Sequence, residues 1–345
     1  MKREHWLRTN PKLWGFVLLL GLAPLVTRDG YFLHVLALAM LWTIFASSWN
    51  LATGYAGLKT FGHQAFFGIG AYVSALASMN LGLTPWLTIW FGGLAAAATG
   101  LFVGLPMLRI KSLPHAAIVT LAFAEIVRIT CSNLVDLTRG ELGLWGIPPF
   151  TPFTLPVIGP LDFGPADRTA SYYLIWILMI AVIAFLAWFV RSRSGLIVQA
   201  IRDSQVAAES LGVDLTRYKL VVSSISAFIA GIAGAFYAHY VLIITPTSVM
   251  GIPLMVQVIA ITLVGGIATL HGPLLGAFVL TVSAEALRIA GDHRMLVFGV
   301  LIILVVLFVP RGLGRLDLLV QEMAQRRLRG TRPAPASTAS AEEKA

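Results

Sequence analysis

The sequence predicts an all-α polytopic membrane protein with about ten transmembrane helices, some of them broken or re-entrant at Gly-rich segments. Of 345 residues, 57% are hydrophobic and only 12% are charged, whereas a soluble domain has about 25% charged residues. The apolar runs approach the roughly 20 residues of a membrane-spanning helix and lack the alternation of a transmembrane β-strand. The net charge of +9 does not indicate nucleic-acid binding, because the basic residues lie between the apolar runs and at both ends.

The apolar runs define ten expected spans, of which the first, fifth and last are short. They are 13–27, 31–53, 61–79, 84–107, 115–132, 172–190, 220–242, 252–270, 273–290 and 295–310. The first follows a basic N-terminus, as in a secretory signal, but it lacks a convincing small-x-small cleavage site. We therefore expect a retained first helix.

The distribution of Lys and Arg predicts that both termini are cytoplasmic. With ten spans, the side that holds both termini collects 19 Lys and Arg residues, and the opposite side has four. Cytoplasmic loops contain the excess of these residues, so we expect loop 191–219 in the cytoplasm and loop 133–171 outside. Residues 1–330 then form one transmembrane domain. Residues 331–345 are small, polar and Pro-containing, and we expect a disordered cytoplasmic tail.

Two Gly-rich segments interrupt the apolar pattern, and neither is a nucleotide-binding loop. In the first, Leu58 puts Lys59 out of P-loop register, and Val73 stands where a dinucleotide-binding turn requires its third glycine. Polar and glycine residues of the first segment are Gly54, Gly57, Gly62, His63, Gln64, Gly68 and Gly70. Those of the second are Gly265, Gly266, His271, Gly272 and Gly276, with Pro273 among them.

Backbone that leaves the helix at membrane depth requires protein or a water-filled cavity to satisfy its polar groups. We therefore favour a cavity-lining or gate role for both segments, with close helix packing as the alternative. His63 and His271 are expected to be hydrogen-bonded interior groups, and no metal site is expected, because neither has a second ligand at metal-binding spacing.

Glu125 lies within an apolar span, three residues before Arg128. At this spacing the two side chains share a helix face and neutralise each other. Glu285 and Arg288 repeat the arrangement. A structural ion pair and a place in a substrate path both remain open for Glu125.

The segment 191–219 is amphipathic where the rest of the chain is apolar. Its expected apolar face consists of Leu196, Ala200, Ala207, Ala208 and Leu211, and Gly212 offers a helix stop. Such a helix fits a groove on a partner. A helix that lies on the membrane surface is the weaker alternative, because acidic residues are mixed with the basic ones.

The chain resembles the permease subunits of bacterial branched-chain amino-acid ABC importers, of the LivM-like type. The resemblance covers about residues 40 to 316, in the order of the family. Its motifs are GYAG (54–57), GHQAFFGIGAY (62–72), AIVTLAFAEIVR (117–128), Thr138-x-Gly140-x-x-Gly143-Leu144, RSRSGLIVQAIRDSQVAAESLGVDLTRYKL (191–220), AGIAGAFYAHY (230–240), VGGIATLHGPLLGA (264–277) and FVPRGLGRL (308–316).

The resemblance implies a transport subunit in the bacterial inner membrane, with no ATPase site of its own and no cofactor. It implies four partners: a second homologous permease, two cytoplasmic ATP-binding subunits and an extracytoplasmic solute-binding protein. Residues 200–212 would be the helix that couples to the ATPases, through Arg202, Asp203, Ala207, Ala208, Glu209 and Gly212. The expected translocation path or gate comprises the first glycine segment (residues 54–70), Thr120, Glu125, Gly265, Gly266 and His271.

The sequence departs from the family at 58–61, 113–115 and His271, and these departures leave the substrate open. Urea, other amino acids and aromatic or carboxylate compounds are the alternatives. A passive channel is disfavoured by the coupling-type loop. A membrane-embedded enzyme is disfavoured because no H-E-x-x-H, G-x-S-x-G or facing aspartate pair is present.

Overall fold

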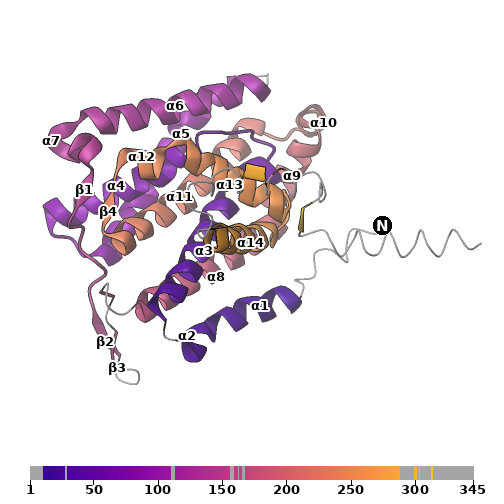
Figure 1. The fold of residues 1–345 in the computed structure, drawn as a ribbon. Helices are drawn as coiled ribbons and strands as arrows, with labels where there is room; N and C mark the ends of the chain where they lie inside the picture. Colours follow the sequence, from indigo (N-terminus) through magenta and orange to yellow (C-terminus); the bar gives the residue numbers. More distant parts are fainter. Residues whose placement is uncertain are drawn as a thin grey trace, which may run out of the picture.

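The computed structural model describes residues 11–27, 29–109, 113–155, 159–161, 163–164, 168–287, 299–300, 303 and 312–313. Helices dominate this part of the chain (Figure 1). The expected tenth span, 295–310, and the expected tail, 331–345, lie almost wholly or wholly outside the described residues.

The helices of the first half are α1 (Pro11–Gly21), α2 (Ala23–Val26), α3 (Gly30–Trp49), the π-helical turn η1 (Asn50–Tyr55), α4 (His63–Leu81), α5 (Pro85–Arg109), α6 (Leu113–Asn133), α7 (Val135–Thr138) and the 3-10 turn η2 (Gly140–Leu142). Those of the second half are α8 (Thr169–Arg191), α9 (Arg193–Asp203), α10 (Gln205–Ser210), α11 (Leu215–Val241), α12 (Pro246–Met250), α13 (Ile252–Gly265) and α14 (Gly272–Ala286). Four short strands are β1 (Leu144–Trp145), β2 (Phe153–Leu155), β3 (Gly159–Leu161) and β4 (Ile243–Ile244).

The described residues contain six helices that are long and apolar enough to cross a membrane, so the expected ten spans are not confirmed. The six are Gly30–Tyr55, Pro85–Pro106, Pro114–Asn133, Thr169–Arg191, Leu215–Val241 and Pro246–Gly265. The helix α1 has 11 residues and α14 has 15. The helix α4 has 19 residues but is not among the six, and its strongly polar residues are His63, Gln64 and Asn80.

The centre of the fold is α11, which packs against α4 and α5 (Figure 1). Small residues allow this close approach. A Cβ at Gly70 of α4 would overlap the carbonyl of Gly231 in α11, and a Cβ at Gly234 would overlap the carbonyl of Phe67. The backbones of α4 and α11 therefore touch directly at two successive points.

A polar network closes one end of this helix packing. His239 of α11 is buried, and its Nε2 forms a hydrogen bond with Ser74 Oγ, 2.9 Å away. Its Nδ1 lies 2.8 Å from the Pro148 carbonyl oxygen. The loop 133–171 is attached here. Phe150 of that loop packs between Trp86 and Phe236.

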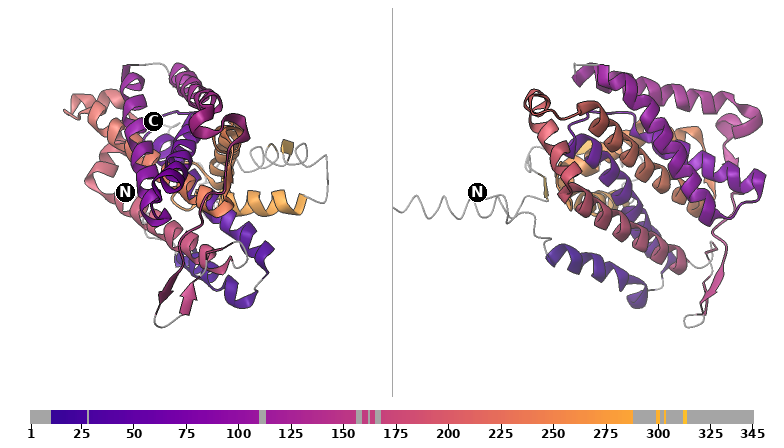
Figure 2. Two further views of the ribbon diagram at one scale, coloured as in Figure 1. Left: turned by 90° about the vertical axis from the view of Figure 1, so that its left-hand side faces the viewer. Right: turned by 180° about the vertical axis from the view of Figure 1, so that it is seen from behind.

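Two views in Figure 2 show the hairpin β2–β3 and the helix α10 at opposite ends of the molecule. Strands β2 and β3 pair antiparallel with Thr154 opposite Pro160, and β1 pairs antiparallel with β4. The loops 133–171 and 191–219 therefore end on opposite sides of the helical domain.

Replacing Gly234 with alanine should lower the thermal stability of the protein, because the added methyl group would overlap the Phe67 carbonyl. Overpacking of a core costs about 1–3 kcal/mol. The matched control is Gly30→Ala, since a Cβ at Gly30 meets nothing within 4 Å. Unfolding of both variants in detergent is followed by size-exclusion chromatography after heating. Equal stability of the two variants would contradict this contact.

Candidate functional site

The span that begins with α3 does not end as a regular helix but widens into the π-helical turn η1. The Ala56 N–H donates to the Leu51 carbonyl, five residues earlier, at 3.1 Å. The chain then runs without regular structure to His63, where α4 begins. The Trp49 Nε1 donates to the Thr60 carbonyl at 2.8 Å and ties this stretch back to the end of α3. Single π-helical turns occur often at functional sites.

The two Gly-rich segments meet at Asn50, the first residue of η1. Asn50 Nδ2 donates to the Thr269 carbonyl at 2.8 Å, and the Ala268 N–H donates to Asn50 Oδ1 at 2.8 Å. A Cβ at Gly54 would lie 2.7 Å from the Ala268 nitrogen. The two breaks, more than 200 residues apart in the chain, thus form one junction.

The second break ends α13 at Gly265 and turns at Gly266, whose φ is 112°. A Cβ at Gly265 would overlap the Gly272 carbonyl, so the chain folds back on itself between α13 and α14. A Cβ at Gly312 would overlap Gly266. Gly312 therefore lies against this junction. His271 precedes α14 and is half-buried.

The segment 191–219 also reaches the junction. Arg202 Nη1, at the end of α9, donates to the Gly54 carbonyl at 3.2 Å. Gly57 has φ of 70°, and a Cβ there would lie 3.0 Å from the Arg202 Cγ. Only glycine fits both the backbone conformation and the close approach. Arg202, expected to take part in coupling to the ATPases, contacts its own subunit here and is exposed.

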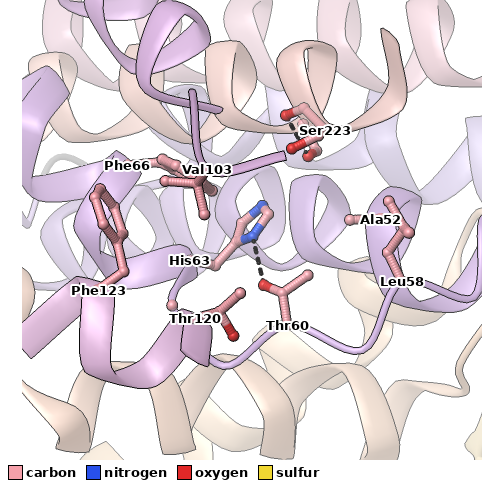
Figure 3. A pocket seen from close by; sticks show the side chains of 11 residues that line it. Ala52, Leu58, Thr60, His63, Phe66, Val103, Thr120, Phe123 and Ser223 are labelled. Atoms are coloured by element: carbon pink, nitrogen blue, oxygen red, sulfur yellow. Dashed lines mark hydrogen bonds between the residues drawn. The ribbon is translucent and has the colours of Figure 1, made fainter. Parts of the chain in front are cut away.

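A small pocket lies beside the start of α4 (Figure 3). Its polar lining consists of Thr60, His63, Thr120, Ser223 and Ser226, and apolar side chains complete the walls. The residues that the sequence analysis did not single out are Asn50, Thr60, Ser223 and Ser226. Polar side chains inside apolar spans were the available signal, since such groups are costly in a membrane.

Within this pocket, His63 Nδ1 lies 3.4 Å from Thr60 Oγ1 (Figure 3), and the Phe61 N–H donates to Thr120 Oγ1 at 3.0 Å. His63 Nε2 has no hydrogen-bond partner among the described residues. Both amide atoms of Gln64 are also unpartnered there, and this side chain is fully buried. Unpartnered buried polar groups are rare, because each costs about 1–3 kcal/mol.

The predicted glycines separate into two groups. Gly54, Gly57 and Gly62 belong to the junction and the pocket, since a Cβ at Gly62 would overlap the Thr120 carbonyl. Gly68 and Gly70 are inside α4, where added Cβ atoms would overlap Met250 and Gly231. For Gly68 and Gly70 the geometry is that of helix packing.

Glu125 forms the expected ion pair within α6. Arg128 Nε and Nη2 donate to Glu125 Oε1 at 2.8 and 2.5 Å, and Arg128 Nη1 lies 3.7 Å from Glu141 Oε1. Glu125 does not line the pocket. In the second expected pair, Arg288 lies outside the described residues, and the Tyr31 hydroxyl donates to Glu285. The part of the chain that the structure describes contains no group of three His, Cys, Asp or Glu that could hold a metal ion.

The expected continuous helix over 200–212 is wrong, because Ser204 interrupts it. Ser204 is extended, with φ of −159° and ψ of 111°, and its side chain accepts from the Ala207 N–H to cap α10. Such caps compete with helix continuation. The expected stop at Gly212 is confirmed by its φ of 80°.

The break changes which apolar residues are exposed. Ala208, expected in a partner groove, is 4% exposed and packs within the subunit, whereas Val206 is 78% and Leu211 is 85% exposed. Ala207 and Glu209 are exposed as well, and Asp203 accepts from Arg202 Nη2 at 2.8 Å. The face available to a partner is thus formed by Val206, Ala207 and Leu211.

Comparison with known proteins agrees with this architecture. Residues 31–306 match the family described as branched-chain amino acid transport system / permease component. The chain is 32% identical over 315 residues to the high-affinity branched-chain amino acid transport system permease protein LivM of Escherichia coli K12, which covers 87% of this chain and 71% of that protein.

More distant relatives include LivH, a second permease protein for high-affinity branched-chain amino acid transport, from Salmonella typhimurium. It is 27% identical over 299 residues, covering 81% of this chain and 92% of its own length. The nucleoside ABC transporter permease protein NupC of Lactococcus lactis is 28% identical over 220 residues, 57% of this chain and 63% of that protein. No solved structure matches the chain. With the family matched over residues 31–306, the chain belongs to the permease components of branched-chain amino acid transport systems.

Proposed function

We propose that this chain is a permease subunit of a bacterial ABC importer and that it forms part of the translocation path for branched-chain amino acids. Its partners are a second homologous permease, two cytoplasmic ATP-binding subunits and an extracytoplasmic solute-binding protein. The observation that supports this most strongly is the family match over residues 31–306, together with 32% identity to LivM. ATP hydrolysis belongs to the partner subunits.

The pocket beside α4 supports a path for a small zwitterion with an apolar side chain. Its apolar walls include Val103 and Phe123, which suit a branched hydrocarbon. No side chain caps the N-terminus of α4 at Gly62, and the partial positive charge of a helix N-terminus stabilises a carboxylate. The hydroxyl and imidazole groups nearby provide further polar contacts.

In the described conformation the pocket holds little more than a water-sized group. Passage of an amino acid therefore requires α4, α6 and α11 to separate. We attribute that separation to the ATPases, which act through the loop 191–219. When this loop is displaced, the translocation path closes to one side of the membrane and opens to the other.

Uptake by the reconstituted complex tests the substrate class directly. Proteoliposomes with this chain and its four partner chains should take up leucine, isoleucine and valine only when ATP is enclosed with the ATPases. Urea, an aromatic acid and a nucleoside, offered at equal concentration, should enter at about one tenth of that rate or less, a ratio that corresponds to about 1.4 kcal/mol. Preferred uptake of any of these three compounds would reassign the substrate.

Replacing His63 with leucine should impair uptake without lowering stability. His63 Nε2 has no partner among the described residues. The hydrogen bond that the substitution removes is the one between His63 Nδ1 and Thr60 Oγ1, and at 3.4 Å it is too long to contribute much stability. Uptake should fall about tenfold, as expected when one polar contact to a substrate is lost. The matched control is Phe66→Leu, an apolar change in the same pocket. Normal uptake with a lowered melting temperature would make His63 a structural group instead.

Orientation and docking are tested with single cysteines at Val206 and Leu142, in a Cys131→Ser background. Both positions are strongly exposed. An impermeant maleimide should label position 142 in intact spheroplasts and position 206 only in inside-out vesicles.

Binding of the ATPases should protect position 206, because the exposed face of α10 is then covered. Labelling of position 206 from outside would reverse the orientation, and unprotected labelling would remove the docking role.

A further inference from the structure

Two segments that are distant in sequence, the loop 266–271 and the end of α9, are both attached to the π-helical turn η1. Asn50, at its start, holds the loop 266–271 through both atoms of its amide. The Gly54 carbonyl, one turn later, accepts from Arg202 at the end of α9. A displacement of α9 therefore acts on the same turn that positions the break between α13 and α14.

The contact of η1 with the loop 266–271 and its contact with α9 each involve more than one interaction. Asn50 is 2% exposed, and it satisfies one backbone N–H and one backbone C=O of the loop 266–271 at 2.8 Å each. Gly54 also lies directly against Ala268. On the other side, Gly57 lies against the Arg202 backbone, where a Cβ would be 3.5 Å from its Cα.

The structure shows η1 with the π-helical hydrogen-bonding pattern, and a regular α-helical turn is the alternative pattern for such a segment. In a π-helical turn each N–H pairs with the carbonyl five residues earlier, whereas an α-helical turn pairs it four residues earlier. A shift between these patterns rotates the residues before the turn relative to those after it. A transmission element needs such a bistable segment, because spatial proximity alone does not show coupling.

We propose that Arg202 and Asn50 are positioning residues that transmit the displacement of the cytoplasmic loop, through η1, to the glycine break at 265–272. This inference rests on the proposed coupling of loop 191–219 to partner ATPases. It assigns a role to Asn50 and redirects Arg202 from a partner contact to a contact inside the subunit.

The test uses two cysteine reporters in the assembled complex, each in a Cys131→Ser background. Val206→Cys reports on the docking loop, and Ile267→Cys, on a partly exposed residue of the second break, reports on the far end of the connection. The rate of reaction with a permeant maleimide is measured with and without a non-hydrolysable ATP analogue. Both rates should change in the otherwise unaltered complex.

In Arg202→Ala and Asn50→Asp, the nucleotide-dependent change at position 267 should shrink about tenfold, as expected for the loss of one buried hydrogen-bonded contact. The change at position 206 should persist. Asn50→Asp is nearly isosteric, and its carboxylate still accepts from Ala268 but no longer donates to Thr269. Uptake should fall together with the response at position 267.

The matched controls are substitutions of a similar kind that remove no contact between α9, η1 and the loop 266–271. Arg193→Ala loses the same charge from the exposed start of α9. Thr43→Val removes a buried hydroxyl whose hydrogen bond, to Ala39, is inside its own helix. Both controls should keep the full response at position 267. If Asn50→Asp fails to assemble, Arg202→Ala alone decides.

The outcomes distinguish the coupling role of the loop 191–219 from the connection through η1. No nucleotide response at position 206 in the unaltered complex would refute the coupling role of the loop, and the connection with it. A response at position 206 without one at position 267, or one at 267 that survives both substitutions, would refute the connection and leave the transport function intact.

Discussion

The structure depends on the requirement that backbone polar groups inside a membrane find partners within the protein. Two helices of candidate membrane spans end at the Gly-rich segments, at Tyr55 and Gly265. The side chain of Asn50 supplies hydrogen-bond partners for the backbone that follows the second of these ends. Its amide oxygen accepts from the Ala268 N–H, and its amide nitrogen donates to the Thr269 carbonyl. Because that side chain belongs to the first break, neither break can be described without the other. The pocket and the contact of Arg202 are arranged around this pair.

Close packing on glycine gives the junction a stiff support. The direct backbone contacts of α4 with α11 fix the start of α4, and so fix His63 and Gln64. At the far end of the same helices, His239 joins α11 to α4 through Ser74 and to the loop 133–171 through Pro148. Interiors packed this tightly transmit strain instead of absorbing it. A movement that opens the pocket therefore involves whole helices.

Local signals in the sequence predicted several features correctly. The stop at Gly212, the Glu125–Arg128 pair and the interruption before His63 each depend on a few neighbouring residues. The role of Asn50 was not predicted, because its partners lie more than 200 residues away. The break at Ser204 was missed because a capping serine is equally compatible with a continuous amphipathic pattern. The number of ten spans is not confirmed, because α1 and α14 are shorter than a membrane-spanning helix and the described residues contain six candidate spans.

The exposed end of α10 has a consequence for the life of the subunit in the cell. Val206 and Leu211 present apolar surface on a short helix flanked by the extended Ser204 and the left-handed Gly212. In the proposed orientation this surface faces the cytoplasm until an ATPase covers it. Exposed apolar patches of this kind promote aggregation, and chaperones and proteases continuously remove such molecules. If an ATPase covers this surface as proposed, we expect permease made without its ATPase to be degraded faster than the assembled complex.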